Sequence, residues 1–257
     1  MQIPSENHTP PSGSDQQVES PPKCPLTVAR TALRACHVRK TVAQWRHWLD
    51  AHQWGLRSSN DGVSHEGFRW PRVGVWCDAP DWDPRNVCGG GLHILVPGLA
   101  SAGFRYGRLE LVEWRGESVV VHNPSDKLKV QSARIIAHGH GIPDEAFVRC
   151  GFKLARGRRV VTVKRDEVCV VRSGTPRITV QSGGECYIHG QSAPNVIVQR
   201  GGACYANGKG APAVTVQSGG WFCAEGQGTP TVTVQRGGLC YIPNQSTAKI
   251  TKEVDNA

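Results

Sequence analysis

The sequence predicts an α+β N-terminal domain followed by a β-solenoid (a parallel β-helix) of about five 18-residue coils. Two observations predict the solenoid: copies of one 18-residue phrase follow one another without a gap, and each copy holds two glycine-rich turns between short strand-like runs. A third predicts the α+β domain, because helical periodicity gives way to alternation of apolar and polar residues in the N-terminal half. The expected parts are a disordered arm (1–27), the α+β domain (28–142), a basic connector (143–160), the repeats (161–246) and a C-terminal cap or tail (247–257).

The N-terminal arm and the overall charge limit where the protein can act. Residues 1–23 are rich in Ser, Pro and Gln and nearly lack large apolar side chains, so burial cannot offset the entropy cost of ordering them. They do not read as a signal peptide, and no run of about 18 apolar residues exists, so we expect a cytoplasmic protein that does not enter a membrane. The ten cysteines are then expected to be reduced thiols. The net charge of +9 favours attraction to a polyanion or an acidic protein.

The first folded element is predicted to be a helix. Val42, Trp45, Trp48 and Leu49 recur at three- and four-residue spacing, which forms one apolar stripe, and Thr41 can cap the start. After a turn-rich stretch, alternation of apolar and polar residues appears in four segments: FRWPRVGVW, LELVEW, ESVVVHN and LKVQSARIIAH. We expect these segments to form the strands of a mixed sheet.

The segment APDWDPRNVCGGGLH, residues 79–93, is the densest site-like stretch of the chain. Three consecutive glycines let the backbone turn tightly, and Cys88 and His93 lie near enough in sequence to converge as an activated thiol and its base. Together with Glu113 they are the candidate catalytic residues of a transferase or hydrolase. The alternative is that Cys88 and His93 only anchor a turn against Trp82.

The connector is the candidate nucleic-acid contact. Residues 149–165 contain seven basic and no acidic side chains, which suits phosphate binding but is also typical of a solvated face. The residues proposed for this contact are Arg149, Lys153, Arg156, Arg158 and Arg159.

The repeats begin at Pro176, Pro194, Pro212 and Pro230, with a degenerate earlier copy at Val161. Each unit buries its apolar side only against the next unit, and right-handed coils are expected. Alternation in the first strand directs two aliphatic residues of each copy inward: Ile178 and Val180, Val196 and Val198, Val214 and Val216, Val232 and Val234. The outward rows are the expected binding surface, and they contain Gln181, Gln199, Gln217, Gln235, Thr179, Thr215 and Thr233, with Ile197 interrupting the threonines.

A second interior row is predicted from Cys186, Cys204 and Cys240, with Phe222 in the equivalent place of the third copy. One thiol per coil, interrupted by Phe222, does not form the four-ligand cluster that zinc requires, so we expect a buried apolar row and no metal. Only two acidic residues occur between residues 176 and 246, which is too few carboxylates for calcium sites. No cofactor is therefore predicted.

Several short motifs of the N-terminal half occur in a characteristic order. They are Cys36, GFRWPRVG (67–74), APDW (79–82), CGGGLH (88–93), LVEWRGESVVVHN (111–123) and DKLKVQSARIIAHG (126–139). In this order they resemble an uncharacterised domain-of-unknown-function family of bacteriophages and bacteria, over about residues 31–142, with a Trp-rich insertion at about 38–62 that departs from the pattern. The resemblance implies a phage or mobile-element origin and short solenoid repeats behind the domain. It implies no chemistry, because the family has no established activity.

The sequence thus favours a non-enzymatic binding or structural protein. Its solenoid is expected to be an interaction or assembly surface for a protein partner or for self-association. The alternatives are a head-domain enzyme that uses Cys88 and His93, and a nucleic-acid-binding protein that uses the basic connector.

Overall fold

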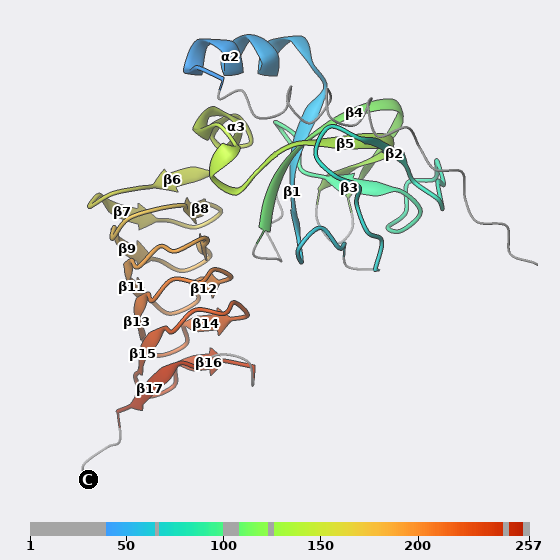
Figure 1. Ribbon diagram of the computed structural model, residues 1–257. Coiled ribbons are helices and arrows are strands. Elements are labelled where there is room, and N and C mark those ends of the chain that lie inside the picture. Colours follow the sequence, from blue (N-terminus) through green and yellow to red (C-terminus); the bar gives the residue numbers. More distant parts are fainter. Residues whose placement is uncertain (1–39, 65–66, 100–107, 123–125, 244–246, 254–257) are drawn as a thin grey trace, which may run out of the picture.

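Figure 1 shows the computed structural model, which describes residues 40–64, 67–99, 108–122, 126–243 and 247–253. The chain forms two parts in succession, a head (residues 40–152) and a β-solenoid of about five turns (residues 153–252). The expected disordered arm and Cys36 lie outside the described residues.

The first helix of the described residues, α2 (Val42–Ala51), begins where its capping residue predicts. The Thr41 hydroxyl accepts a hydrogen bond from the Gln44 backbone N–H, and the Gln44 side chain accepts one from the Thr41 N–H at 2.7 Å, so two N–H groups of the first turn are satisfied reciprocally. Trp48 and Leu49 are buried, whereas Val42 is 68% exposed. Trp45 packs against the same core while partly buried, so of the predicted apolar stripe only Val42 faces solvent.

The head contains one five-stranded sheet with strand order β1–β4–β5–β2, and β3 also pairs with β5. Its strands are β1 (Trp54–Ser59), β2 (Trp76–Asp78), β3 (Leu92–Ile94), β4 (Arg108–Val121) and β5 (Lys127–His138). All of these pairs are antiparallel, so the expectation of a mixed sheet is wrong: β4 returns directly as β5, and no helical crossover intervenes. Apolar residues of β4 and β5 contribute to two cores, so both faces of the sheet are covered.

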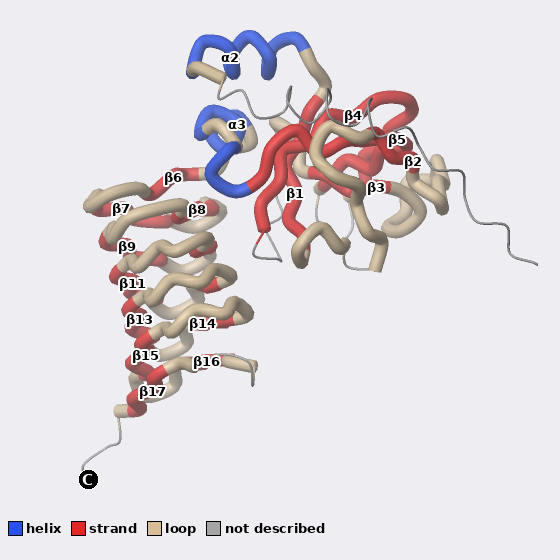
Figure 2. The backbone as a smooth tube through the Cα atoms, in the orientation of Figure 1, coloured by secondary structure: helices blue, strands red, loops and turns tan. Residues whose placement is uncertain are grey.

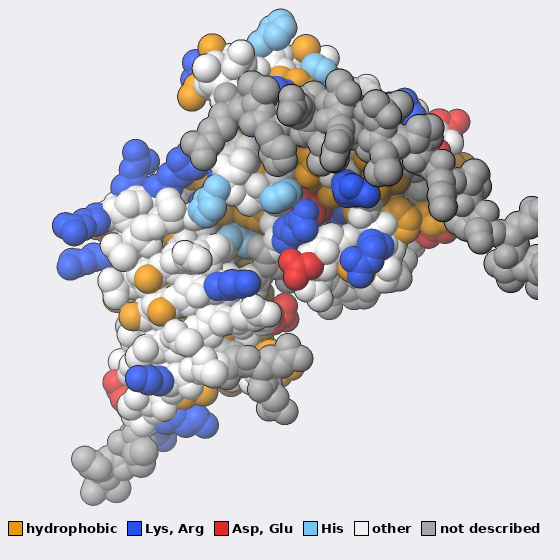
Figure 3. Space-filling view, viewed as in Figure 1, with side chains coloured by type: hydrophobic (Ala, Val, Ile, Leu, Met, Phe, Trp, Pro, Cys, Tyr) orange, Lys and Arg blue, Asp and Glu red, His pale blue; other side chains and the backbone are white. Residues whose placement is uncertain are grey.

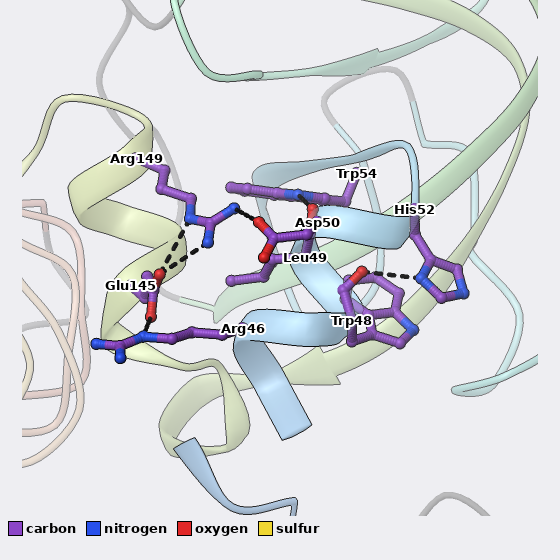
Figure 4. Close-up of polar contacts among 8 residues, drawn as sticks. All are labelled: Arg46, Trp48, Leu49, Asp50, His52, Trp54, Glu145 and Arg149. Carbon is purple, nitrogen blue, oxygen red and sulfur yellow. Dashed lines mark hydrogen bonds and ion pairs between the residues drawn. The ribbon is translucent and has the colours of Figure 1, made fainter. Parts of the chain in front are cut away.

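Two short elements lead from the sheet to the solenoid. A 3-10 turn, η1 (Gly139–Gly141), follows β5, and helix α3 (Asp144–Arg149) packs Phe147 into the core beneath α2. Figure 4 shows how α3 is tied to α2: Glu145 accepts hydrogen bonds from Arg46 at 2.7 Å and from Arg149 at 2.8 Å, and Arg149 also binds Asp50 at 2.6 Å.

The solenoid consists of two parallel six-stranded sheets, which Figure 2 shows as two columns of short strands joined by turns. We call them the even sheet and the odd sheet after their strand numbers. The even sheet contains β6 (Lys153–Ala155), β8 (Val168–Val171), β10 (Glu185–Ile188), β12 (Ala203–Ala206), β14 (Trp221–Ala224) and β16 (Leu239–Tyr241). The odd sheet contains β7 (Val160–Val163), β9 (Arg177–Val180), β11 (Asn195–Val198), β13 (Ala213–Val216), β15 (Thr231–Val234) and β17 (Lys249–Lys252).

The strand register confirms the predicted interior. Val180, Val198, Val216 and Val234 occupy equivalent positions on successive strands, and all four are buried in one continuous core. The predicted cysteine row is also present. It includes one more residue, Cys169, which lies opposite Cys186 in the strand register as a free thiol. Each fully buried aliphatic side chain contributes about 1.5–3 kcal/mol relative to an exposed one, so the stacked rows stabilise the array.

The solenoid starts earlier than expected. Lys153–Ala155 pairs with β8 as the first rung of the even sheet, so the boundary at Val161 and the connector at 143–160 need correction. Residues 144–149 are helical, and the first coil begins at Lys153. Sequence comparison missed this rung because its spacing to the next coil is 16 residues (Lys153 opposite Cys169) instead of 18.

At the other end, the tail forms the last rung. β17 pairs with β15 in register, so residues 249–252 extend the odd sheet. The predicted repeat boundary at 246 therefore ends one strand too early. Lys252 lies opposite Val234, so it takes the register position that points inward in the earlier coils, but in this last coil its side chain is exposed.

Candidate functional site

The candidate catalytic thiol lies at the surface of the head. Cys88 is exposed, and its Sγ accepts a hydrogen bond from the Lys127 ammonium group at 3.2 Å. No hydrogen bond joins Cys88 to His93 among the described residues. The structure therefore places a lysine, and not the expected histidine, against this thiol.

His93 lies within β3, where its neighbours oppose protonation. Burial and, to a smaller extent, the positive charges of Lys127 and Lys129 together lower its pKa to about 4. The imidazole is therefore neutral at pH 7. Its Nε2 is buried, and no described residue hydrogen-bonds to it. A neutral imidazole acts as a base only when a nucleophile lies within hydrogen-bond reach, and the thiol of Cys88 contacts Lys127 instead.

Glu113 lies elsewhere on the sheet. It accepts hydrogen bonds from the Arg134 guanidinium at 2.8 and 2.7 Å. Glu113 is paired with Arg134 on β5, whereas His93 is paired with Lys129 on the same strand. The two positions are five residues apart along β5, which corresponds to about 17 Å. The structure does not bring Cys88, His93 and Glu113 together as a triad.

Lys129 explains what the glycine-rich loop does, and sequence reasoning overlooked this residue. Its side chain is fully buried, and its Nζ donates to the backbone carbonyl oxygens of Arg85, Val87 and Gly89 at 2.7, 3.1 and 3.2 Å. A Cβ on Gly91 would lie 2.5 Å from the Cγ of Lys129, so only glycine fits beside the lysine stem. The loop thus surrounds one ammonium group, and this contact accounts for its glycine-rich sequence without a catalytic role.

The predicted nucleic-acid residues divide into two groups. Three of them form ion pairs: Arg149 with Glu145 and Asp50, Lys153 with Glu167, and Arg156 with Asp144. The other two, Arg158 and Arg159, are exposed in the turn before β7, and no ion pair involves them within the described part of the chain. Of these pairs, only Arg156–Asp144 joins the head to the first coil, because Arg149 pairs within the head and Lys153 pairs within the solenoid.

The threonine row of the odd sheet is longer than the sequence indicated. The register aligns Thr162, Thr179, Ile197, Thr215, Thr233 and Thr251 on six successive strands, and these side chains point outward. Thr162 and Thr251 were missed because the first and last coils depart from the 18-residue phrase. Their signal was the short pattern of alternating Val and Thr around residue 162 and the ITK tripeptide at 250–252.

A column of glutamines adjoins this row, because one glutamine follows two residues after the row position in each of four coils. Gln181 is exposed, and Gln199, Gln217 and Gln235 are half-buried, so the amides are accessible from outside the coil. The backbone N–H of each of these residues continues the odd-sheet ladder, for example from Gln199 to the Val180 carbonyl at 2.9 Å. The predicted outward rows therefore lie side by side on one flat face.

The even sheet has a different environment, because the head covers part of it. Val170 and Tyr187 point outward from β8 and β10 and are buried in the same core as Trp48 and Phe147 of the head. Further down, where the head does not reach, Leu239 and Tyr241 are 57% and 52% exposed. Figure 1 accordingly shows the odd sheet on the side of the solenoid away from the head.

The charge of the protein is concentrated in the solenoid. Residues 153–252 contain 13 Lys and Arg but only four Asp and Glu. This excess equals the net charge of +9 of the whole chain, so the remainder of the sequence is balanced. Figure 3 shows Lys and Arg side chains gathered over the β6 and β7 end of the solenoid.

Comparison of the chain with protein-family models, with curated proteins and with solved structures found no match in any of the three. Within the described residues, no group of three or more His, Cys, Asp or Glu side chains is placed to hold a metal ion. No helix in this part of the chain is long and apolar enough to cross a membrane.

Proposed function

We propose that this chain is a non-enzymatic binding or structural protein whose solenoid is the surface for interaction or assembly. The observation that carries the proposal is that the head covers part of the even sheet and leaves the outward face of the odd sheet open. The even sheet packs Val170 and Tyr187 against the head, whereas the odd sheet presents a flat row of threonines and glutamines outward. The entire charge excess lies on the same part of the chain. Flat, repetitive solenoid faces of this kind are suited to extended partners.

The geometry of the head gives less support to an enzyme. Cys88 contacts Lys127, His93 is neutral and half-buried, and Glu113 is committed to Arg134. A nucleophile and its base need to lie within about 3 Å of each other, directly or on substrate binding. The glycine-rich loop is accounted for by Lys129, which holds three of its carbonyl groups.

The test compares two triple variants of the full-length protein. Thr179→Glu, Thr215→Glu and Thr233→Glu add bulk and charge to the odd-sheet face without touching the interior. The matched control adds the same charges to exposed head positions: Asn60→Glu, Asn86→Glu and Ser118→Glu. Each immobilised protein is incubated with lysate of the cells that produce it, and the retained protein and nucleic acid are quantified.

We expect the unmodified protein and the head variant to retain the same macromolecules, and the solenoid variant to lose them. Equal retention by the solenoid variant, or loss by the head variant alone, would contradict the proposal. Thermal unfolding of both variants checks that the fold is intact.

We also propose a phage or mobile-element origin and a cytoplasmic location. The support is the resemblance carried by the ordered motifs of the head, among them GFRWPRVG (67–74) and CGGGLH (88–93). The genes beside the coding sequence test this: tail, capsid or integrase genes would support it, and a neighbourhood of housekeeping genes would count against it.

A further inference from the structure

The turn that follows each odd-sheet strand carries a second repeating feature, which we call the corner column. Its members are Arg165, Ser182, Arg200, Ser218 and Arg236, one from each successive coil. Arginine therefore recurs on every second coil, and since coils are about 4.8 Å apart, the arginine positions are separated by about 10 Å. The intervening serines add hydroxyl groups between the charges.

The glycines of the next coil let the arginine stems lie flat along the column. A Cβ on Gly183 would lie 3.0 Å from the Cγ of Arg165, and a Cβ on Gly219 would lie 2.9 Å from the Cγ of Arg200. The two side chains thus run along the solenoid axis, with their guanidinium groups at the surface. Neither Arg165 nor Arg200 has an ion-pair partner among the described residues.

The adjoining face of the odd sheet is mostly polar, with Val160 and Ile197 as exposed aliphatic residues, and the acidic group nearest the corner column in sequence is Asp166, which follows Arg165. Besides the threonine row, its outward positions are Val160, Arg177, Asn195, Ala213, Thr231 and Lys249. No aromatic residue is among them, and the exposed Lys164 and Arg158 border the face near β7. The face therefore combines positive charge, hydroxyl groups and amide groups on a flat surface.

We propose that this face, together with the corner column, binds the phosphate backbone of double-stranded nucleic acid. The inference rests on the proposed function, because it names the partner of the same solenoid surface. Arg, Ser, Thr, Gln and Asn are the side chains that usually contact phosphate and sugar, and such contacts carry no sequence preference. The charge complementarity comes from a basic face that has no acidic residue in its two outward rows.

The composition of the face selects a duplex over other polyanions. A single strand exposes its bases, and proteins that hold single strands supply aromatic side chains for stacking, which the outward rows of the odd sheet lack. The described residues of the solenoid contain no helix that could enter a groove, so the odd-sheet face fits backbone contact. Six rungs extend for about 24 Å, which corresponds to about seven base pairs.

The experiment uses fluorescence anisotropy to measure binding of the full-length protein to a fluorescein-labelled DNA duplex of about 20 base pairs and arbitrary sequence. The salt concentration is varied from about 50 to about 200 mM, because affinity that depends on phosphate contacts falls strongly over this range. The test variant carries Arg165→Gln, Arg177→Gln and Arg200→Gln. The control carries Arg69→Gln, Arg72→Gln and Arg115→Gln, which remove the same charge from exposed positions of the head.

We expect the unmodified protein to bind with affinity that falls steeply with salt. The solenoid variant should bind at least tenfold more weakly at the lower salt concentration, with a slope of log K against log salt that is smaller by about 2–3, because each lost phosphate contact removes about 0.9 from that slope. The head variant should change affinity by less than about threefold.

Three results would overturn the inference: no salt-dependent binding of the duplex, equal loss in both variants, or equally tight binding of poly-glutamate or of a single strand. These outcomes separate the two proposals. If the threonine-to-glutamate variant still loses its retained partner while the duplex fails to bind, the solenoid remains the interaction surface and only the nucleic-acid assignment fails.

Discussion

At the scale of single residues, Lys129 is the side chain on which the head loop depends most. A buried ammonium group is tolerated only when its donors are satisfied, and three carbonyl oxygens of residues 85–89 do this. The sequence suggests Cys88 and His93 as a reactive pair. In the structure, Cys88 lies within the loop whose carbonyl groups bind Lys129, and His93 follows that loop on β3. Lys129 lies in the motif DKLKVQSARIIAHG (126–139), which contributed to the family resemblance but gave no indication of this structural role.

Replacement of Lys129 by Met should therefore destabilise the protein. The substitution keeps most of the stem but leaves the carbonyl groups without donors, so we expect the free energy of unfolding to fall by about 2–4 kcal/mol. Urea denaturation followed by tryptophan fluorescence measures this, because Trp82 lies near the Lys129 ammonium. The control is Lys127→Met, which should change the value by less than about 0.5 kcal/mol. Equal effects of the two substitutions would contradict the role assigned to Lys129.

At the scale of elements, the coil is the unit of the solenoid. Strands β9 to β15 are paired at an 18-residue spacing, and each coil contacts chiefly the coils before and after it. Glycines at the corners are part of this unit: a Cβ on Gly210 would lie 1.8 Å from the Ser192 carbonyl oxygen, so neighbouring coils approach too closely there for any other residue. A change that respects the 18-residue period should then be tolerated, and one that breaks it should not.

Deletion of one complete coil tests this expectation. Removal of residues 212–229 brings Val198 against Val234 and Cys204 against Cys240, so the interior rows are preserved. We expect a β-rich protein that still unfolds cooperatively, with a melting temperature lower by about 5–10 °C. Removal of residues 212–220 instead places an even-sheet strand in the odd sheet, and it should abolish the cooperative transition. Circular dichroism during heating distinguishes the two, and identical melting curves would refute the coil as the unit.

At the scale of the whole molecule, the outer edge of the last described rung is open to pairing. Among the described residues no strand pairs with the outer edge of β17, and such an edge can pair with another chain. Lys252 occupies the inward position that Val234 holds in the coil above, and its charge also acts on Cys240 in the interior row. A lysine at an inward position of an edge strand disfavours the stacking of a second solenoid there, because its charge would be buried.

Lys252→Val should remove this protection. We expect the variant to self-associate as its concentration rises, and sedimentation velocity will show larger species than for the unmodified protein. Lys209→Val, in an exposed turn, is the control for a general loss of charge. If both variants sediment like the unmodified protein, the lysine does not guard the end.

Contacts between the head and the solenoid fix which sheet of the solenoid is covered. Arg172 of the solenoid is buried and donates to the Asp144 carboxylate at 2.7 Å and to the Gly139 carbonyl at 2.7 Å. Burial lowers the pKa of Arg172 to about 10, while the Asp144 charge opposes that shift. These contacts, with the packing of Tyr187, decide which face of the solenoid is covered and leave the odd sheet open.

The sequence by itself determined the solenoid, its 18-residue period and its interior rows, because in a repeat each residue meets its own equivalent in the next coil. Alternation along a four-residue strand is then enough to assign Val198 and Thr215 to opposite sides. The same reasoning predicted the capped helix at Thr41. These features depend on neighbours that are near in sequence or related by the repeat.

Only the tertiary structure decided the rest. The separation of Glu113 from His93 depends on the register of β4 and β3 against β5, which no local pattern specifies. The three carbonyl partners of Lys129, the addition of Thr162 and Thr251 to the threonine row, and the covering of the even sheet by the head all join residues with no repeat relation between them or with an altered spacing. Such contacts are selected by the packing of whole elements, so they become visible only when the chain is folded.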